Sequence, residues 1–163
     1  MKKWESSEAY KSINKIIDIL GVILTLFLVI ITFMHWKDAA DIVPTHYNMR
    51  GEVDGYGSRN TILYILPIAL IIYIAMSILG RYPQIYNYAV NITTENKEKQ
   101  YNMASTFMRV INVEIMVIFV SMQIRLDITG NNNGNSFLIF LPIELIIIFG
   151  SIAFYIYKSI KNK

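Results

Sequence analysis

Cysteine is absent from this chain of 163 residues, and acidic and basic residues together make up only 17% of it. The absence of cysteine excludes disulfides, thiolate metal sites and cysteine nucleophiles. Apolar residues take the place of the missing charges, because 54% of the chain is hydrophobic, a composition typical of membrane proteins. The formal net charge of +3 gives little support to nucleic-acid binding, so no nucleic acid is expected as a partner.

Four apolar runs are long enough to cross a bilayer. A helix needs about 20 mainly apolar residues to cross about 30 Å of hydrocarbon. The third run is interrupted by polar side chains, so we expect that helix to face protein more than lipid. The expected spans are residues 14–36, 61–80, 107–126 and 137–157. The sequence therefore predicts an all-α integral membrane protein, a single membrane domain of residues 1–163 whose first partner is the lipid bilayer.

The distribution of basic residues predicts the orientation of these spans. Eleven of the 15 Lys and Arg fall in the two terminal segments and in the second connection, counted to include Arg109, and four fall in or next to the other two loops. Basic residues gather on the cytoplasmic side of membrane proteins. We therefore expect a multi-pass protein of the cell membrane with both termini and residues 81–106 in the cytoplasm, and with residues 37–60 outside.

The loop at residues 37–60 is the one long polar passage of the chain, and its composition predicts order. Pro44 restricts Val43 to extended backbone, and Asp54-Gly55 is a turn signal. Loops of this length without regular structure are uncommon in compact proteins unless they are functional. We expect this outer loop to be structured and to lie against the ends of the helices.

The outer loop resembles the signature of the family called domain of unknown function 1648, an Ile-Pro-x-His-x-Asn-x-x-Gly-x-x-Asp-x-x-Gly run directly after a first membrane helix. The matching residues are Pro44, His46, Asn48, Gly51, Asp54 and Gly57. The resemblance covers roughly residues 15–80 and implies an integral membrane protein of bacterial or archaeal type.

The best-characterised proteins with this signature are SdpI-type immunity proteins. They protect a bacterium from its own secreted peptide toxin, and they relay a signal by holding a transcription repressor at the membrane. The resemblance thus implies binding or sensing at the cell surface through the outer loop, a secreted peptide as ligand, and a cytoplasmic repressor by analogy only. A further signature in the C-terminal half of those proteins is missing from residues 109–163.

Three interpretations of the loop chemistry remain open. His46 and Asn48 point to one side of an extended segment, and a turn at Gly51 brings Asp54 back towards them. Imidazole and carboxylate suit zinc, so His46 and Asp54 are candidate metal ligands, to which Asp41 or Glu52 would add a third.

Alternatively, the loop recognises an extracellular peptide or a lipid headgroup, with Tyr47 and Tyr56 supplying contact area. In the third interpretation the same polar residues only fix the turns of the loop by bonding its backbone. A hydrolase would need an activated nucleophile, and Ser58 or Thr45 with His46 has no recognised spacing. We therefore expect no enzyme and no cofactor.

Arg109, Glu114 and Glu144 are charged residues inside the predicted third and fourth spans, and Arg125 lies closer to the outer surface. A charge within hydrocarbon is costly unless it is paired, protonated or hydrated. Such groups serve either as interhelical hydrogen-bond partners or as a path for protons or substrate. The alternative to a binding function is therefore a small transporter or channel that uses these carboxylates, and a metal-dependent membrane enzyme is the third hypothesis.

Overall fold

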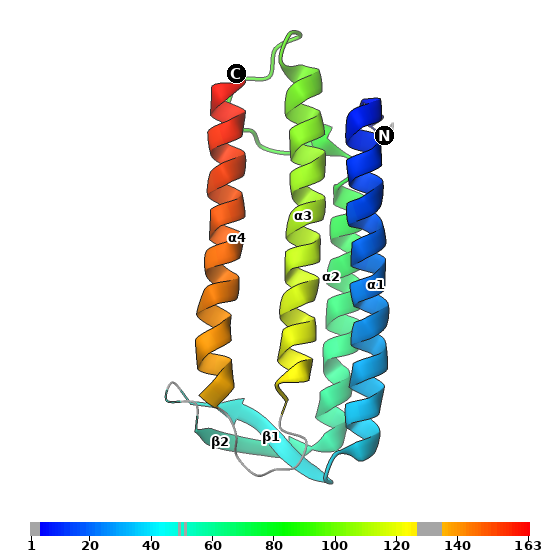
Figure 1. The fold of residues 1–163 in the computed structure, drawn as a ribbon, viewed down its shortest axis with the longest axis vertical. Helices are drawn as coiled ribbons and strands as arrows, with labels where there is room; N and C mark the ends of the chain where they lie inside the picture. Colours follow the sequence, from blue (N-terminus) through cyan, green and yellow to red (C-terminus); the bar gives the residue numbers. More distant parts are fainter. Residues whose placement is uncertain (1–3, 49, 51, 127–134) are drawn as a thin grey trace.

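Four long helices form the body of the protein. The computed structural model describes residues 4–48, 50, 52–126 and 135–163. The helices are α1 (Glu8–Asp38), α2 (Ile65–Leu79), α3 (Lys97–Ile124) and α4 (Asn135–Lys161), with 3-10 turns η1 (Arg59–Tyr64) and η2 (Pro83–Ile85). The helices run side by side along the long axis, and both termini lie at the end opposite the two strands (Figure 1). Four helical segments are long and apolar enough to cross a membrane, so the predicted all-α class is confirmed.

Helices α1, α3 and α4 are longer than the expected spans, because they continue past the apolar runs into polar sequence. α3 begins at Lys97, so residues 97–106 belong to this helix, and the connection from α2 is shorter than expected. α2 is preceded by η1, and the two together give a segment of 21 residues. Pro67 is the third residue of α2, where a missing amide breaks no helical hydrogen bond.

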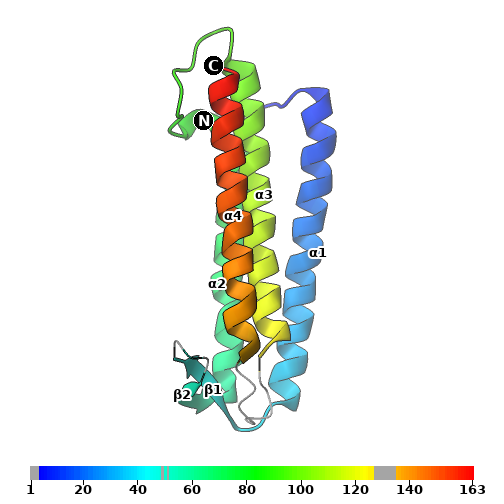
Figure 2. The ribbon, with the colours of Figure 1, turned by 60° about the vertical axis from the view of Figure 1, so that its left-hand side comes forward.

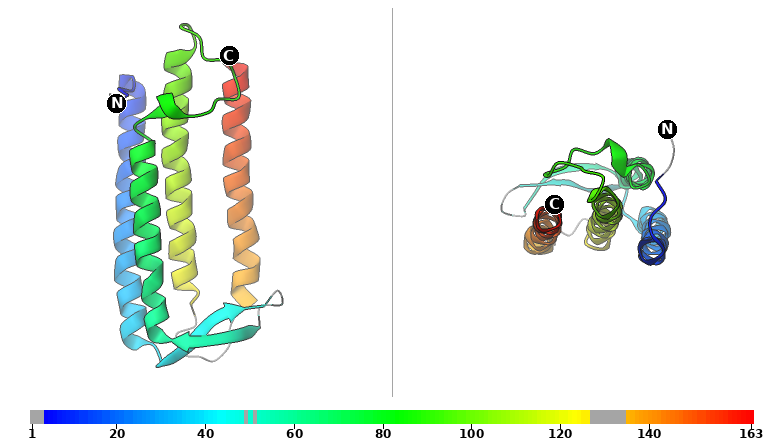
Figure 3. Two further views of the ribbon diagram at one scale, coloured as in Figure 1. Left: turned by 180° about the vertical axis from the view of Figure 1, so that it is seen from behind. Right: turned by 90° about the horizontal axis from the view of Figure 1, so that it is seen from above.

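Helix α3 holds the bundle together. It packs against α1, α2 and α4, whereas α4 has α3 as its main neighbour, an arrangement visible from above in Figure 3. An apolar core joins α1, α2 and α3 through Leu28, Ala69, Met116 and Val120. Burial of such side chains stabilises the packing, although most of the apolar surface of the helices faces outward, as it does in proteins surrounded by lipid.

Buried polar side chains of α3 bond each of the other helices, which agrees with the expectation that this span faces protein. Gln123 Nε2 donates to Thr32 Oγ1 of α1 at 2.8 Å, and Asn112 Nδ2 donates to Ser77 Oγ of α2 at 3.1 Å. Gln100 Nε2 donates to the Ser159 carbonyl of α4 at 2.9 Å. Each bond satisfies a polar group that is costly to bury alone, and together these bonds fix the relative heights of the helices.

Residues 80–96 return along the end of the bundle where the termini lie. The Tyr86 hydroxyl donates to the Leu79 carbonyl at 2.6 Å, and the Tyr88 hydroxyl donates to the Pro83 carbonyl at 2.8 Å. Burial raises the pKa of Tyr86 to about 12, so this phenol remains protonated and keeps its hydrogen bond over the physiological pH range. The connection is therefore held against the end of α2.

The loop between α1 and α2 contains two antiparallel strands, β1 (Ile42–Tyr47) and β2 (Val53–Ser58). We call residues 42–58 the hairpin. It lies across the end of the helices farthest from the termini (Figures 1 and 2). The sequence predicted an ordered loop against the helix ends, and in the structure this loop forms a small two-stranded sheet.

Candidate functional site

The base of the hairpin is anchored to the helices. Val43 is fully buried and packs with Ala39 and Ile62. The Trp36 indole donates to Asn60 Oδ1 at 2.9 Å, and the Arg59 amide donates to the Asp41 carbonyl at 3.0 Å. These contacts bring the end of α1 and the start of η1 together. The base of the hairpin is therefore fixed to the helices.

His46 and Asp54 meet across the two strands, as the sequence pattern predicted. The His46 Nδ1 atom and the Asp54 Oδ1 atom are in hydrogen-bond contact, and the two side chains are 71% and 45% exposed. The strand register shifts on both sides of His46, between Pro44 and His46 and between His46 and Tyr47. Such bulges re-aim a side chain out of the regular alternation, and here they place the imidazole beside the carboxylate.

Asn48 has the role that the third interpretation gave it, which is to fix a turn of the loop by bonding its backbone. Its Oδ1 accepts hydrogen bonds from the amides of Arg50 at 2.8 Å and Glu52 at 3.0 Å, while its Nδ2 donates to Glu52 Oε2 at 2.8 Å. These bonds shape the turn between the strands, which is the usual use of asparagine in turns. Asn48 therefore does not complete a group with His46 and Asp54, and Gly51, also predicted for the site, lies outside the described residues.

Gly57 of the signature and the nearby Gly55 allow the strands to approach closely. A Cβ atom on Gly55 would lie 2.9 Å from His46 Cβ, and one on Gly57 would lie 2.9 Å from Thr45 Cγ2. Both distances are shorter than van der Waals contact, so a larger residue would push the strands apart. Pro44, also in β1, is buried. Pro44, Gly55 and Gly57 thus shape the hairpin, and His46 and Asp54 are the polar pair it presents.

Asp41 and Glu52, the additional metal ligands considered from the sequence, do not join His46 and Asp54. The Asp41 carboxylate lies 3.8 Å from Arg59 at the base of the hairpin, and Glu52 bonds Asn48 in the turn. Across the described ranges, no cluster of three or more His, Asp or Glu side chains is arranged to hold a metal ion. The His46–Asp54 pair therefore offers two donor groups, fewer than a closed metal site requires.

The arrangement of hydroxyl groups around the pair gives no support to the hydrolase interpretation. Ser58 pairs in register with Ile42, at the other end of the strands from His46. Its Oγ accepts a hydrogen bond from the Asn60 amide at 3.3 Å, where it caps η1. Ser58 and His46 thus lack the nucleophile-to-base contact of a catalytic pair.

A cavity of about 220 Å³ lies between the hairpin and the ends of α2 and α3. Its wall is mostly apolar and comes from four elements: Pro44, Thr45, Thr61, Ile62, Ile65, Met122, Gln123 and Leu126. Sequence reasoning did not find this cavity, because its wall joins β1 to helices that are distant in the chain. The hairpin thus combines an exposed polar pair with a small apolar cavity near its base.

The two carboxylates in the spans have separate partners. Glu144 Oε1 lies 2.8 Å from Arg125 Nη2, and the side chains of Arg125 and Glu144 are only 14% and 12% exposed. Glu114 instead accepts a hydrogen bond of 2.5 Å from the Ser151 hydroxyl. Glu144 and Ser151 are seven residues apart on α4, roughly 10 Å along the helix. Each carboxylate therefore ties α3 to α4 at a different height.

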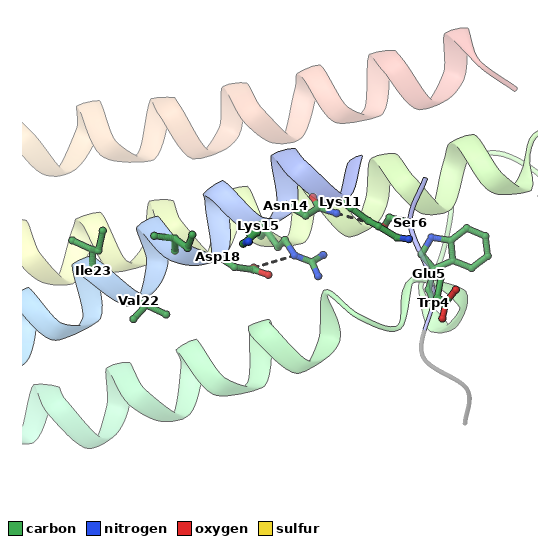
Figure 4. Close-up of a pocket in the computed structure, with 11 residues that line it drawn as sticks. Trp4, Glu5, Ser6, Lys11, Asn14, Lys15, Asp18, Val22 and Ile23 are labelled. Atoms are coloured by element: carbon green, nitrogen blue, oxygen red, sulfur yellow. Dashed lines mark hydrogen bonds and ion pairs between the residues drawn. The ribbon is translucent and has the colours of Figure 1, made fainter. Parts of the chain in front are cut away.

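Arg109 joins three helices at the end near the termini. Its Nε atom lies 3.0 Å from Asp18 Oδ1 of α1, and its Nη1 donates to the Gly80 carbonyl at 2.7 Å. The same nitrogen donates to the Ser105 carbonyl at 2.8 Å. Asp18 was not singled out in the sequence, because its partner lies on another helix. Asp18 and Arg109 both line a cavity of about 650 Å³ beside the N-terminal part of α1, where Figure 4 labels Asp18.

Four apolar helices joined by polar contacts, with an ordered hairpin at one end, define a multi-pass helical membrane protein. Residues 23–71 match the family model described as Domain of unknown function (DUF1648). The matched segment runs from α1 through the hairpin into α2, so the predicted resemblance to this family is confirmed over that part of the chain. No curated protein and no solved structure matches the chain.

Proposed function

We propose that this protein lies in the cell membrane with both termini in the cytoplasm and binds a ligand at the cell surface through the hairpin. The orientation rests on the excess of Lys and Arg near the termini. The proposed class is immunity or signalling of the SdpI type, and the proposed ligand is a secreted peptide. The proposal is one of binding, with neither catalysis nor a resident cofactor.

The exposed pair of His46 and Asp54 is the observation that carries this proposal. Asn48 and the two glycines already account for the shape of the turn and for the close strands. A polar contact between side chains as exposed as these contributes at most about 1 kcal/mol to stability. The pair is therefore not required for the fold, and it is well placed to bond a ligand.

The surroundings of the pair favour a peptide with both cationic and apolar side chains. Asp54 is 45% exposed on its carboxylate side chain and Tyr56 of the same strand is 58% exposed. A carboxylate beside an accessible ring suits a cationic side chain, which a ring also attracts by its face. The cavity of about 220 Å³ near the base of the hairpin has room for one apolar side chain of such a peptide.

Signalling through a cytoplasmic repressor is the part of the proposal that rests on family resemblance alone. It would use the end of the bundle where the termini and residues 80–96 lie. Binding at the hairpin and capture of a repressor are therefore separable, and the experiments below address binding first.

A survival assay tests the proposed ligand. A deletion strain complemented with the wild-type gene, with His46→Ala or with Asp54→Asn is challenged with the secreted peptides of neighbouring strains. We expect the wild type to survive and both variants to lose protection at equal protein levels. The matched control is Asp41→Asn, which removes the same charge from the same loop at its 92% exposed base residue. Equal survival of all strains, including the deletion, would remove the immunity proposal.

The absence of cysteine makes the orientation directly testable. Single cysteines introduced as Glu52→Cys in the hairpin and Lys163→Cys at the C-terminus are labelled in intact cells with a membrane-impermeant maleimide. We expect labelling at position 52 in intact cells and labelling at position 163 only after the membrane is opened. The reverse pattern would place the hairpin in the cytoplasm and exclude binding at the cell surface.

A further inference from the structure

A cavity of about 570 Å³ lies between α3 and α4 near the termini, far from the hairpin. Helix α3 and helix α4 supply most of its wall, with Tyr10 of α1 beside them. The lining residues are Tyr10, Lys99, Met103, Thr106, Phe107, Val110, Ser151, Phe154, Tyr155, Lys158 and Asn162. It is thus a groove between two helices with a polar mouth and largely apolar walls.

The mouth of the groove is cationic. Lys99 comes from α3 and Lys158 from α4, both are exposed, and none of the lining residues is acidic. The cavity of about 650 Å³ beside α1 is different, because Glu5 and Asp18 line it together with its basic residues. Of these two cavities, the groove between α3 and α4 is therefore the one that combines two basic side chains with a lining free of acidic residues.

The deeper part of the groove is apolar and aromatic. Lys99 and Val110 are eleven residues apart on α3, which places the bottom of the groove roughly 16 Å below its mouth. The rings of Phe107 and Tyr155 stack with centroids 4.3 Å apart, and Lys158 Nζ lies 5.5 Å from the ring of Phe154. The lysines thus lie at the polar boundary of the span, and the aromatic wall extends into the hydrocarbon.

We infer that this groove binds an anionic phospholipid, with the headgroup phosphate between Lys99 and Lys158 and an acyl chain along the wall of α3 and α4. Basic pockets between membrane helices bind anionic headgroups, because the ammonium groups pair with phosphate at the depth where the lipid presents it. A soluble phosphate would use the lysines but not the apolar wall. The groove therefore fits a lipid better than a free anion.

The purified full-length protein in detergent tests this inference by native mass spectrometry after addition of phosphatidylglycerol or phosphatidylcholine. A basic residue near an anionic lipid surface changes affinity roughly fivefold. We therefore expect the variant Lys99→Gln/Lys158→Gln to bind phosphatidylglycerol about 30-fold more weakly than the wild type does. Binding of phosphatidylcholine should be equal in both proteins.

The matched control is Lys11→Gln/Lys15→Gln, which removes two charges from the same end of the bundle but from the cavity beside α1. We expect this control to bind phosphatidylglycerol within about twofold of the wild type. An equal loss in both double variants would mean that general surface charge, and not the groove, holds the lipid. No loss in either variant would also overturn the inference.

A competition experiment separates a lipid from a free phosphate. Glycerol 3-phosphate carries the same phosphate ester without acyl chains, and it is added to the wild-type protein bound to phosphatidylglycerol. We expect it not to displace the lipid at equal concentration, because the apolar wall contributes to lipid binding. Displacement at equal concentration would assign the site to a soluble phosphate. Circular dichroism checks that the variants are folded, and both lysines are exposed, so glutamine disturbs no buried contact.

Discussion

Replacement of Glu144 by glutamine should destabilise the protein much more than the same replacement of Glu114. Both carboxylates lie on helices that span the membrane, and both tie α3 to α4. Glu144 pairs with the charged Arg125 at 2.8 Å, whereas Glu114 accepts a hydrogen bond from the neutral Ser151 hydroxyl. Glutamine keeps an acceptor oxygen at both positions but removes the negative charge. The two variants therefore differ in whether a buried cation loses its partner.

The expected cost follows from the geometry of each contact. Unit charges 2.8 Å apart attract by about 6 kcal/mol at an effective dielectric constant near 20, and desolvation offsets part of that attraction. Breaking a buried pair leaves the other charge uncompensated and costs roughly 3 to 5 kcal/mol. At Glu114 the Ser151 hydroxyl still donates to the amide oxygen, so we expect a cost of about 1 kcal/mol or less.

A double-mutant cycle measures the coupling free energy between Glu144 and Arg125, which single variants alone do not give. The unfolding free energies of Glu144→Gln, Arg125→Gln and the double variant are measured in detergent micelles by denaturant titration. We expect the double variant to be more stable than the sum of the two single losses predicts, with a coupling of about 2 kcal/mol or more. Glu114→Gln serves as the control for loss of a carboxylate from the same helix pair.

Equal losses for Glu144→Gln and Glu114→Gln, together with coupling near zero, would refute this reasoning. The same variants address the transport alternative. If the carboxylates conduct protons, both glutamine variants should abolish proton flux in proteoliposomes while they remain folded. Wild-type flux that survives in folded Glu114→Gln protein would exclude a path through that residue, and its hydrogen bond to Ser151 would then be purely structural.

Two further predictions follow from close contacts. Gly55→Ala should destabilise the hairpin by roughly 1 to 3 kcal/mol, because the new Cβ would lie 2.9 Å from His46 Cβ; faster limited proteolysis between the strands would show it, and an unchanged rate would contradict it. Asp18→Asn should lower the free energy of unfolding by less than about 1 kcal/mol, because the Asp18 side chain is 45% exposed. Arg109→Leu should lower it several times more, because this change also removes the hydrogen bond to the Gly80 carbonyl at the end of α2. Similar melting temperatures for the two variants would be inconsistent with this assignment.

The sequence predicted the features that depend on nearby residues. Apolar runs gave the four spans, because crossing a bilayer imposes a length and a composition on each helix separately. The contact of His46 with Asp54 could also be predicted from the sequence, because a turn between two extended segments brings residues eight apart together. The polar character of the third span correctly indicated a helix that faces protein.

Contacts between distant segments were not predictable in the same way. Arg109 was noticed as a buried charge, but its partners Asp18 and Gly80 lie on other helices, and spacing along one helix carries no information about their heights. The cavity near the base of the hairpin was not predicted for the same reason, because its wall is formed by helix ends and β1, which are distant in the sequence. The polar start of α3 is a local feature that the sequence does indicate, because Thr94 is a candidate cap for a helix that continues into the third span, and the structure begins α3 at Lys97.

Part of the loop between α1 and α2 packs against the helices, and part of it does not. The Arg59 amide donates to the Asp41 carbonyl at 3.0 Å, so the chain returns at residue 59 to the place it left at residue 41. A short turn would therefore connect the first two spans. Val43 belongs to the cluster beneath the hairpin and contributes to packing, but His46 and Asp54 lie beyond that cluster and remain exposed. The ordered but solvent-facing part of the hairpin contributes little to the packing of the bundle, as expected if its role is the proposed binding of a ligand.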